Sequence, residues 1–314
     1  MVKFSLVLAC SAVVLAACQV VSLGNLASPA RAPAAISADA TAPAGYARLL
    51  NTTPYGFRYS VDGEPVRRGL VSERFELRSD ECSGSDCGNP RYRSEIRMEN
   101  DANRARLGQD SWYGWSFYNA NVSSYPRDVA LKTVFGQWKV DGDVPPAIRI
   151  VQIGRDEGDW AKCDPRVCTP ASDGSKDVVL QLDDMQQAMG WGTAQNEGYI
   201  CRLFSMDASK GEWTDIVLNT NFSNTSDGYL RAWVNGELAC DYKGRVVATT
   251  DRAFRARPNH RRGIFVSYTT RWDNVQKSKP KPTMIVYYDE FLSGKSREEV
   301  DTRMRAAMGF GAKD

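Results

Sequence analysis

Short stretches of alternating apolar and polar residues, interrupted by Gly, Asn, Asp and Pro, run through the chain from about Tyr46 onward. This period of two is typical of β-strands that bury one face, and the interruptions favour turns. No long helical segments alternate with the strands, which excludes a parallel α/β fold. Candidate strands lie at residues 74–78, 92–98, 113–119, 129–140, 147–154, 178–182, 213–222, 228–234, 237–242, 263–269 and 284–291.

This number of strands predicts an all-β fold, because large twisted sheets bury their apolar faces by packing in pairs. We expect a two-sheet jelly roll, a concanavalin-like sandwich, over residues 46–314. Between two of the strands, Asn235-Gly236 predicts a type I′ hairpin turn, since both residues accept positive φ.

A short C-terminal helix is the only clearly predicted helix. Ser296 and Glu299 form a capping-box pattern, and Val300, Met304 and Met308 recur at every fourth position. We expect this helix to pack against the outside of a sheet.

The N-terminal segment resembles a bacterial export signal. Lys3 precedes an apolar run, residues 4–17, that is too short to span a membrane. Residues 15–18 read L-A-A-C and resemble a lipobox, although an ordinary signal peptide containing a cysteine is the alternative. The resemblance implies a signal peptide at residues 1–17, lipidation of Cys18, with palmitate as a component, and anchoring to the outer membrane. Residues 18–45, rich in Ala, Pro and Ser, predict an unfolded tether.

The six cysteines after Cys18 favour disulfides, because their number is even and the chain is predicted to be exported. Fifteen pairings are formally possible. Local pairing is the simplest and gives Cys82–Cys87 and Cys163–Cys168, which leaves Cys201 for Cys240. Zinc binding is the alternative, but the C-x4-C spacing differs from the C-x2-C of common zinc modules.

Charge and histidine content exclude several functions. With 40 Lys and Arg against 38 Asp and Glu, no strong overall field attracts nucleic acid. The single histidine, His260, excludes multi-histidine metal sites, so we expect no cofactor and no catalytic metal; a structural calcium ion is compatible with the sequence. We also expect a monomer. A local basic run favours an anionic ligand and comprises Arg252, Arg255, Arg257, Arg261 and Arg262.

Two predicted strands carry polar side chains on one face. Alternation places Arg93, Glu95 and Arg97 together on the strand at residues 92–98, and Gln137 with Lys139 on the strand at residues 129–140. Guanidinium groups held by a carboxylate present planar donors to an anionic substrate. A solvated outer face is the alternative.

Three segments resemble motifs of the jelly-roll polysaccharide lyases of the alginate lyase, heparin lyase I and glucuronan lyase type. Residues 93–97 read R-S-E-I-R and resemble the family's R-(S/T)-E-(L/V)-R. Residues 137–139, Q-W-K, are similar to Q-x-H, and residues 261–265, R-R-G-I-F, to K-x-G-x-Y. The motifs occur in the family's order, and the resemblance covers roughly residues 50–292.

The resemblance implies β-elimination at a uronic acid, which needs a neutraliser for the carboxylate, a base and an acid. Gln137 with Arg93 suits neutralisation, because aimed donors stabilise developing negative charge. Lys139 stands where the family has its catalytic His and serves as base if burial and neighbouring arginines depress its pKa, with His260 as the competing base. The family's catalytic Tyr falls on Phe265, so the candidate acids are Tyr268 and Tyr118. The expected substrate-binding residues are Arg93, Glu95, Arg97, Arg261 and Arg262.

Two functions follow as hypotheses. The first is a lyase that cleaves an anionic uronic-acid-containing polysaccharide, and the second is a catalytically weak or inactive lipoprotein that only binds such a glycan. Glycoside hydrolysis needs two carboxylates flanking the bond, and the E-x-D-x-x-E strand of sandwich glucanases is missing.

Overall fold

The computed structural model describes most of the chain from residue 41 onward, and Ile36–Asp314 group into one compact unit. The described residues are 41–88, 91–99, 105–125, 129, 131–139, 145–152, 162–163, 176–182, 199–247, 257–267, 269–277 and 279–314. The predicted signal peptide, Cys18, most of the predicted tether, Cys168 and Tyr268 lie outside them.

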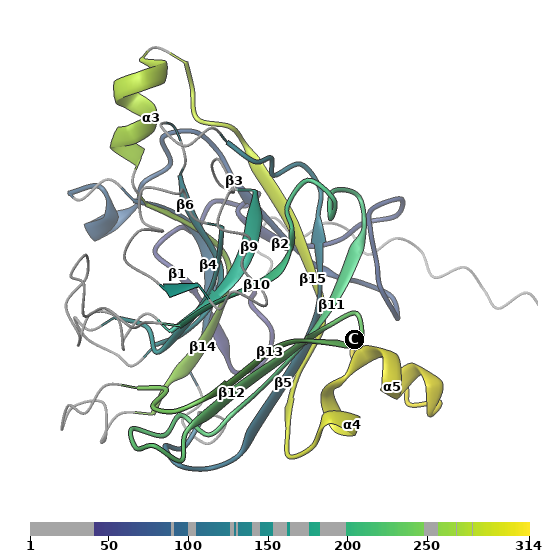
Figure 1. The fold of residues 1–314 in the computed structure, drawn as a ribbon. Coiled ribbons are helices and arrows are strands. Elements are labelled where there is room, and N and C mark those ends of the chain that lie inside the picture. Colours follow the sequence, from purple (N-terminus) through teal and green to yellow (C-terminus); the bar gives the residue numbers. More distant parts are fainter. Residues whose placement is uncertain are drawn as a thin grey trace, which may run out of the picture. The chain divides into compact units, whose positions relative to one another are not determined.

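The first sheet has eight described strands (Figure 1). Neighbours in this sheet are antiparallel, except that the last two are parallel. In spatial order its strands are β1 (Tyr46–Leu49), β4 (Tyr92–Met98), β14 (Asn259–Ser267), β6 (Lys132–Lys139), β7 (Ile148–Gln152), β9 (Asp177–Gln181), β10 (Tyr199–Ser205) and β8 (Lys162–Cys163).

The second sheet has seven described strands, all paired antiparallel. In spatial order they are β13 (Glu237–Lys243), β12 (Tyr229–Val234), β11 (Trp213–Thr220), β5 (Ser111–Asn119), β15 (Met284–Gly294), β3 (Glu73–Leu77) and β2 (Phe57–Tyr59). The crossing order of the strands in both sheets makes the chain a two-sheet jelly roll, which confirms the predicted all-β fold.

The hydrophobic core lies between the sheets. Ile96, Trp138 and Ile264 from the first sheet and Trp115 and Phe117 from the second are buried in one cluster. Because side chains alternate along a strand, the residues on either side of each core residue point away from the core. The alternation seen in the sequence therefore fixes which side chains share a face of each strand.

Two disulfides are present among the described residues, and both match the predicted pairing. Cys201 on β10 and Cys240 on β13 join the two sheets, with the Cα atoms 6.0 Å apart. Cys82–Cys87 closes a short loop before β4. Cys168 lies outside the described residues, so the pair Cys163–Cys168 stays a prediction.

Local turn chemistry also agrees with the sequence. Val234 of β12 pairs with Glu237 of β13, which leaves Asn235 and Gly236 as a two-residue turn. Their φ angles are 50° and 93°, as a type I′ turn requires.

The C-terminal helix is divided in two, α4 (Arg297–Val300) and α5 (Thr302–Ala307), where the sequence predicts one. Asp301 lies between them and caps α5, since its side chain accepts from the backbone N–H groups of Arg303 and Met304. Ser296 precedes α4 but makes no side-chain cap.

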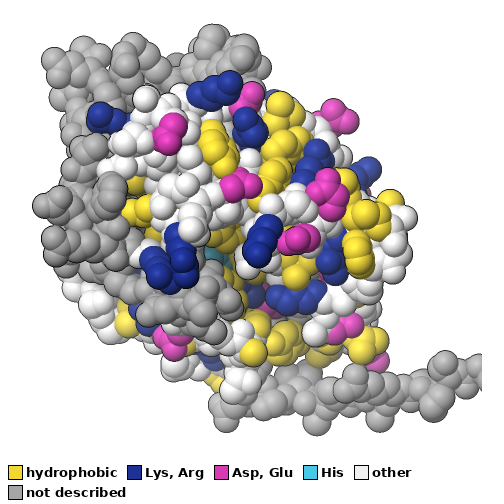
Figure 2. Space-filling view, turned by 90° about the horizontal axis from the view of Figure 1, so that it is seen from below, with side chains coloured by type: hydrophobic (Ala, Val, Ile, Leu, Met, Phe, Trp, Pro, Cys, Tyr) yellow, Lys and Arg dark blue, Asp and Glu magenta, His cyan; other side chains and the backbone are white. Residues whose placement is uncertain are grey.

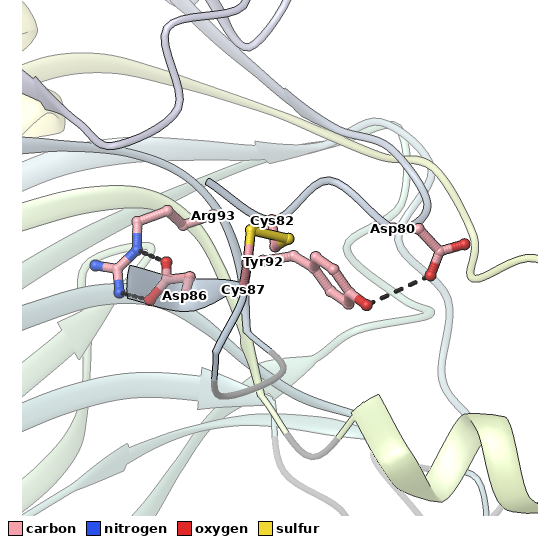
Figure 3. The surroundings of a disulfide bond; sticks show 6 residues. All are labelled: Asp80, Cys82, Asp86, Cys87, Tyr92 and Arg93. Carbon is pink, nitrogen blue, oxygen red and sulfur yellow. Dashed lines mark hydrogen bonds and ion pairs between the residues drawn. A yellow bond between two sulfur atoms is a disulfide. The ribbon is translucent and has the colours of Figure 1, made fainter. Parts of the chain in front are cut away.

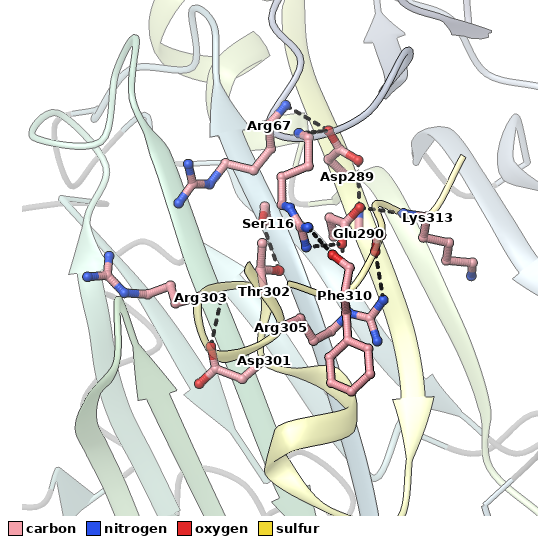
Figure 4. A network of polar contacts seen from close by, with 12 residues as sticks. Arg67, Ser116, Asp289, Glu290, Asp301, Thr302, Arg303, Arg305, Phe310 and Lys313 are labelled. Carbon is pink, nitrogen blue, oxygen red and sulfur yellow. Dashed lines mark hydrogen bonds and ion pairs between the residues drawn. The ribbon is translucent and has the colours of Figure 1, made fainter. Parts of the chain in front are cut away.

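The helices pack against the outer face of the second sheet, as predicted. A Cβ on Gly114 of β5 would lie 2.0 Å from the carbonyl oxygen of Val300, so only glycine admits this approach. Figure 4 shows the adjoining polar network, in which Oε1 of buried Glu290 accepts a hydrogen bond from the backbone N–H of Lys313, with N and Oε1 2.6 Å apart. Of the predicted apolar stripe, Val300 is buried, whereas Met308 is exposed.

Four strands and one α-helix of the described residues escape the sequence prediction. They are β1, β2, β8, β10 and α3 (Thr269–Gln276). In helix α3, Trp272 is the only hydrophobic residue that packs against the core. The helix therefore has no apolar stripe, and its sequence shows no recurrence of apolar residues at helical spacing. In the described part of the chain, no helix combines the length and apolarity needed to cross a membrane.

Candidate active site

The predicted site residues meet on the outer face of the first sheet, where β14 lies between β4 and β6. Arg261 is opposite Arg97 on one side and opposite Gln137 on the other. Gly263 is opposite Glu95. Since the alternate residues of these strands belong to the core, the outward-facing side chains of the three strands form one polar surface. We call this surface the polar face.

Glu95 lies at the centre of the contacts on the polar face. Gln137 donates from Nε2 to Glu95 Oε1 at 2.5 Å, and Arg93 donates to Glu95 Oε2 at 3.3 Å. The Glu95 side chain is only 2% exposed. A buried carboxylate needs such donors, and in return it fixes the amide and the guanidinium relative to one another.

Arg93 is also held by the ring of Phe265 on β14. The guanidinium carbon lies 4.7 Å from the ring centroid, within the range of a cation–π contact. Burial lowers the pKa of Arg93, but the hydrogen bond to Asp86 and the charges of Glu95 and Asp86 raise it above its usual value, so the group stays charged. Phe265, which has no hydroxyl group to ionise, therefore acts as a platform for Arg93.

Lys139 ends β6 beside the polar face and is half-buried. It is opposite Asn259 on β14, whose Oδ1 accepts from Arg261 Nε at 3.0 Å. Arg149 on β7 is opposite Gln137 and adds another guanidinium on the same side of the sheet. Sequence reasoning missed Arg149, although its alternation with the core residues Ile148 and Ile150 could have placed it there.

Figure 2 shows Lys and Arg side chains among acidic and apolar ones on the face of the molecule seen from below. Among the coloured side chains in that view, Lys and Arg are interspersed with Asp and Glu, which agrees with the near-neutral net charge. Recognition of an anion therefore depends on local groups such as those of the polar face. Arg252 and Arg255 of the predicted basic run lie outside the described residues.

His260 is wrongly predicted as a competing base. It follows the opposite alternation to Arg261, is only 2% exposed, and stacks on Phe291 with ring centroids 4.1 Å apart. Burial, helped by the charge of Arg262, holds the pKa of His260 well below its usual value. The ring is therefore a neutral core residue on the far side of the sheet from Gln137.

Arg262 and Tyr118 are also wrongly assigned. Arg262 points into the sandwich, where it forms a two-pronged ion pair with Glu73 of β3. Tyr118 lies on β5 in the other sheet and alternates with the core residue Phe117, so it faces outward there and contacts Trp213. Neither can reach the polar face.

Arg93, Glu95, Arg97, Gln137, Lys139 and Arg261 thus come together as predicted, while His260, Arg262 and Tyr118 do not. Tyr268 lies outside the described residues. Within the described ranges, no group of three or more His, Cys, Asp or Glu side chains is placed to hold a metal ion.

The chain is thus a two-sheet jelly roll that carries amide and guanidinium groups on adjacent strands of one sheet. The model of the polysaccharide lyase family matches residues 48–292, and the chain belongs to this family. No curated protein matches the sequence.

Solved structures of other proteins are similar to this chain. The endo-β-1,4-glucuronan lyase from the fungus Trichoderma reesei superposes with a TM-score of 0.54 at 14% identity, covering 84% of this chain and 96% of that one. The marine alginate lyase AlyA1 from Zobellia galactanivorans gives a TM-score of 0.43 at 11% identity, covering 75% and 83%. At 14% identity, the likeness to the glucuronan lyase shows the fold alone.

Proposed function

We propose that this protein is a polysaccharide lyase that cleaves an anionic uronic-acid-containing polysaccharide by β-elimination. The observation that carries the proposal is the convergence of Arg93, Glu95, Gln137 and Arg261 from three strands on one face. Family membership supports it, and the glucuronan lyase that shares the fold is named for a polymer of this class.

In the proposed reaction, the C5–H bond of the uronic acid breaks and its electrons form a C4–C5 double bond as the C4–O bond to the leaving sugar breaks. Negative charge grows on the carboxylate while the proton leaves. Gln137 and Arg93 donate hydrogen bonds to that carboxylate and lower the barrier, because Glu95 and Phe265 hold both donors in place before the substrate arrives.

Lys139, in its neutral form, is the proposed base, since it lies on the same face as Gln137 and two residues along the strand. Arg97 and Arg261 are proposed to bind neighbouring uronate groups. Tyr268 is kept as the proposed acid that protonates the departing oxygen. The reaction as proposed uses only side chains of this chain.

The alternative is a protein that binds an acidic glycan without cleaving it. One observation favours it: Phe265 occupies the position of the family's catalytic Tyr and packs under Arg93. A retained binding surface with a lost proton donor would give binding without turnover.

The two functions are distinguished by incubating the purified protein with alginate, polyglucuronate, heparin-like and bacterial capsular glycans and recording ultraviolet absorbance from unsaturated ends. We expect absorbance to grow with one of them. Gln137→Ala and Lys139→Ala are expected to lower the rate by about a hundredfold or more. Lys243→Ala, which removes an exposed lysine on the other sheet, is the matched control and should leave the rate unchanged.

Glycan binding without any absorbance change would reject cleavage in favour of the alternative. Full activity in both Gln137→Ala and Lys139→Ala would reject the assigned roles.

We further propose that the protein is a monomer anchored to the outer membrane through lipidated Cys18. Cells expressing it should incorporate a labelled palmitate analogue into the protein and retain it in the membrane fraction. Cys18→Ala should abolish both, and incorporation that persists in this variant would contradict the anchor.

A further inference from the structure

A small closed loop precedes β4 and reaches the polar face from the side. The disulfide Cys82–Cys87 closes it, and inside the ring a single turn of 3₁₀ helix, η1 (Gly84–Asp86), forms. The backbone N–H of Asp86 donates to Ser83 O at 3.2 Å, so the turn is internally bonded. Closing a loop removes conformations that the open segment would otherwise sample.

Asp86 projects from this loop onto Arg93 (Figure 3). Arg93 Nε donates to Asp86 Oδ2 at 2.5 Å and a terminal nitrogen donates to Oδ1 at 2.8 Å, which is a two-pronged ion pair. The Asp86 side chain is 4% exposed and that of Arg93 is 12% exposed. Water therefore screens the attraction between the two charges only weakly, and the two hydrogen bonds fix the orientation of the guanidinium relative to the carboxylate.

The ion pair determines which edge of Arg93 faces a ligand. Asp86 accepts hydrogen bonds from the edge formed by Nε and one terminal nitrogen, and Glu95 accepts one from the other terminal nitrogen. The ring of Phe265 covers one face of the guanidinium plane. Of the five N–H groups of the guanidinium, Asp86 takes two and Glu95 takes one, so two remain, at least one of them on the edge between the two terminal nitrogens. That edge is the planar fork that matches a carboxylate.

Asp86 also protects the contact between Glu95 and Gln137. With two carboxylates beside it, Arg93 uses only one oxygen of Glu95, and the other oxygen accepts from Gln137. Without the Asp86 charge, Arg93 has Glu95 as its only carboxylate among these contacts, and a guanidinium favours binding both oxygens of a carboxylate. Arg93 would then compete with Gln137 for Glu95 Oε1.

We propose that Asp86, held by the Cys82–Cys87 loop, is a positioning residue that sets the donor edge of Arg93 and preserves the Glu95–Gln137 contact for substrate binding. The proposal rests on the proposed function for its kinetic consequence. The position of Arg93 itself is independent of that function.

The loop also supplies a matched control. Asp80 lies on the other side of the disulfide, accepts from Tyr92 at 3.4 Å, and pairs with Lys281 at 3.0 Å, away from Arg93 (Figure 3). Asp80→Asn removes the same charge from the same segment without touching the polar face.

The experiment compares Asp86→Asn, Asp86→Glu and Asp80→Asn with the wild type, using polyuronate turnover and NMR of protein labelled with ¹⁵N at arginine Nε. In Asp86→Asn we expect KM to rise about 10- to 100-fold, the range that loss of a charged hydrogen-bond pair gives, with a smaller fall in kcat. The Arg93 Nε–H signal should shift and exchange faster with water. Asp86→Glu should recover part of the KM, and Asp80→Asn should behave as wild type.

The double variant Cys82→Ser/Cys87→Ser should change KM and the Arg93 signal in the same direction as Asp86→Asn. An unchanged KM and an unchanged Arg93 signal in Asp86→Asn would overturn the proposal, as would an equal KM rise in Asp80→Asn. If the wild type cleaves no polyuronate, the proposed function fails, and the NMR comparison alone decides whether Asp86 positions Arg93.

Discussion

Replacing Arg262 tests whether the two consecutive arginines on β14, Arg261 and Arg262, have different roles. Arg261 is on the polar face, whereas Arg262 crosses the core from the first sheet to Glu73 in the second. Its guanidinium is also 4.2 Å from the ring centroid of Tyr46 and 4.6 Å from that of Phe291. Burial lowers the pKa of Arg262, but the charges of Glu73 and Tyr46 and the hydrogen bonds to both groups together raise the pKa above its usual value.

Arg262→Met removes one partner of this ion pair and leaves the Glu73 carboxylate without its cation. Such a change in a buried pair costs about 3–5 kcal/mol of unfolding free energy. The Glu73 side chain is 13% exposed and so regains some hydration, which favours the lower end, about 3 kcal/mol. For a domain of this size, Tm falls by ~2–4 °C per kcal/mol, so we expect a decrease of roughly 6–12 °C.

The assay is thermal unfolding followed by circular dichroism, together with turnover per folded molecule. Adding Glu73→Gln to Arg262→Met removes the unpaired charge and should restore part of the lost stability. Arg231→Met is the control, because its ion pair with Asp241 is exposed and contributes about 1 kcal/mol or less. A wild-type Tm for Arg262→Met combined with a raised KM would refute the structural role and return Arg262 to substrate binding.

Three further outcomes are expected. Gly114→Ala should lower Tm by several degrees and detach the C-terminal helices, because the added Cβ would overlap the Val300 carbonyl oxygen. Detachment is measured as faster amide hydrogen exchange at Val300. An unchanged exchange rate would contradict this packing. Burial raises the pKa of Asp289 to about 7. Between about pH 4 and pH 7 the folded protein therefore keeps a proton on Asp289 that the unfolded chain has already released. The unfolding free energy should consequently fall as the pH rises through this range. Urea titrations should show this slope and its loss in Asp289→Asn, whereas an equal slope in both proteins would exclude Asp289 as its source. Reducing the Cys201–Cys240 disulfide, or replacing both residues with Ala, should lower Tm and leave KM unchanged, because the bond joins the sheets away from the polar face. A changed KM would show that the bond also supports the polar face.

Much of the fold was predictable because its signals are local. The alternation at residues 92–98 gives the bounds of β4 without error, and Asn235-Gly236 gives the hairpin turn. The pairing of Cys201 with Cys240 follows from local pairing of the other cysteines and agrees with the structure. Short strands such as β2 escaped, since three residues carry too little period to be recognised.

The candidate site was predictable in part. Alternation along one strand puts Arg93 with Glu95, and alternation along another puts Gln137 with Lys139, which is a property of the strands themselves. Asp86 was missed because it lies in the single 3₁₀ turn η1, outside any strand, where no two-residue period relates its side chain to the sheet.

The sequence by itself determined which residues share a strand face, since the two-residue period is set by the backbone of each strand. Only the tertiary structure decided which face is covered and which strands are neighbours. His260, Arg261 and Arg262 are consecutive, yet the packing of the second sheet against one side of β14 places the first and third in the core between the sheets and leaves Arg261 on the other side, opposite Gln137, more than a hundred residues away in the chain. Burial and register are properties of the contact between distant segments, so no local pattern can specify them.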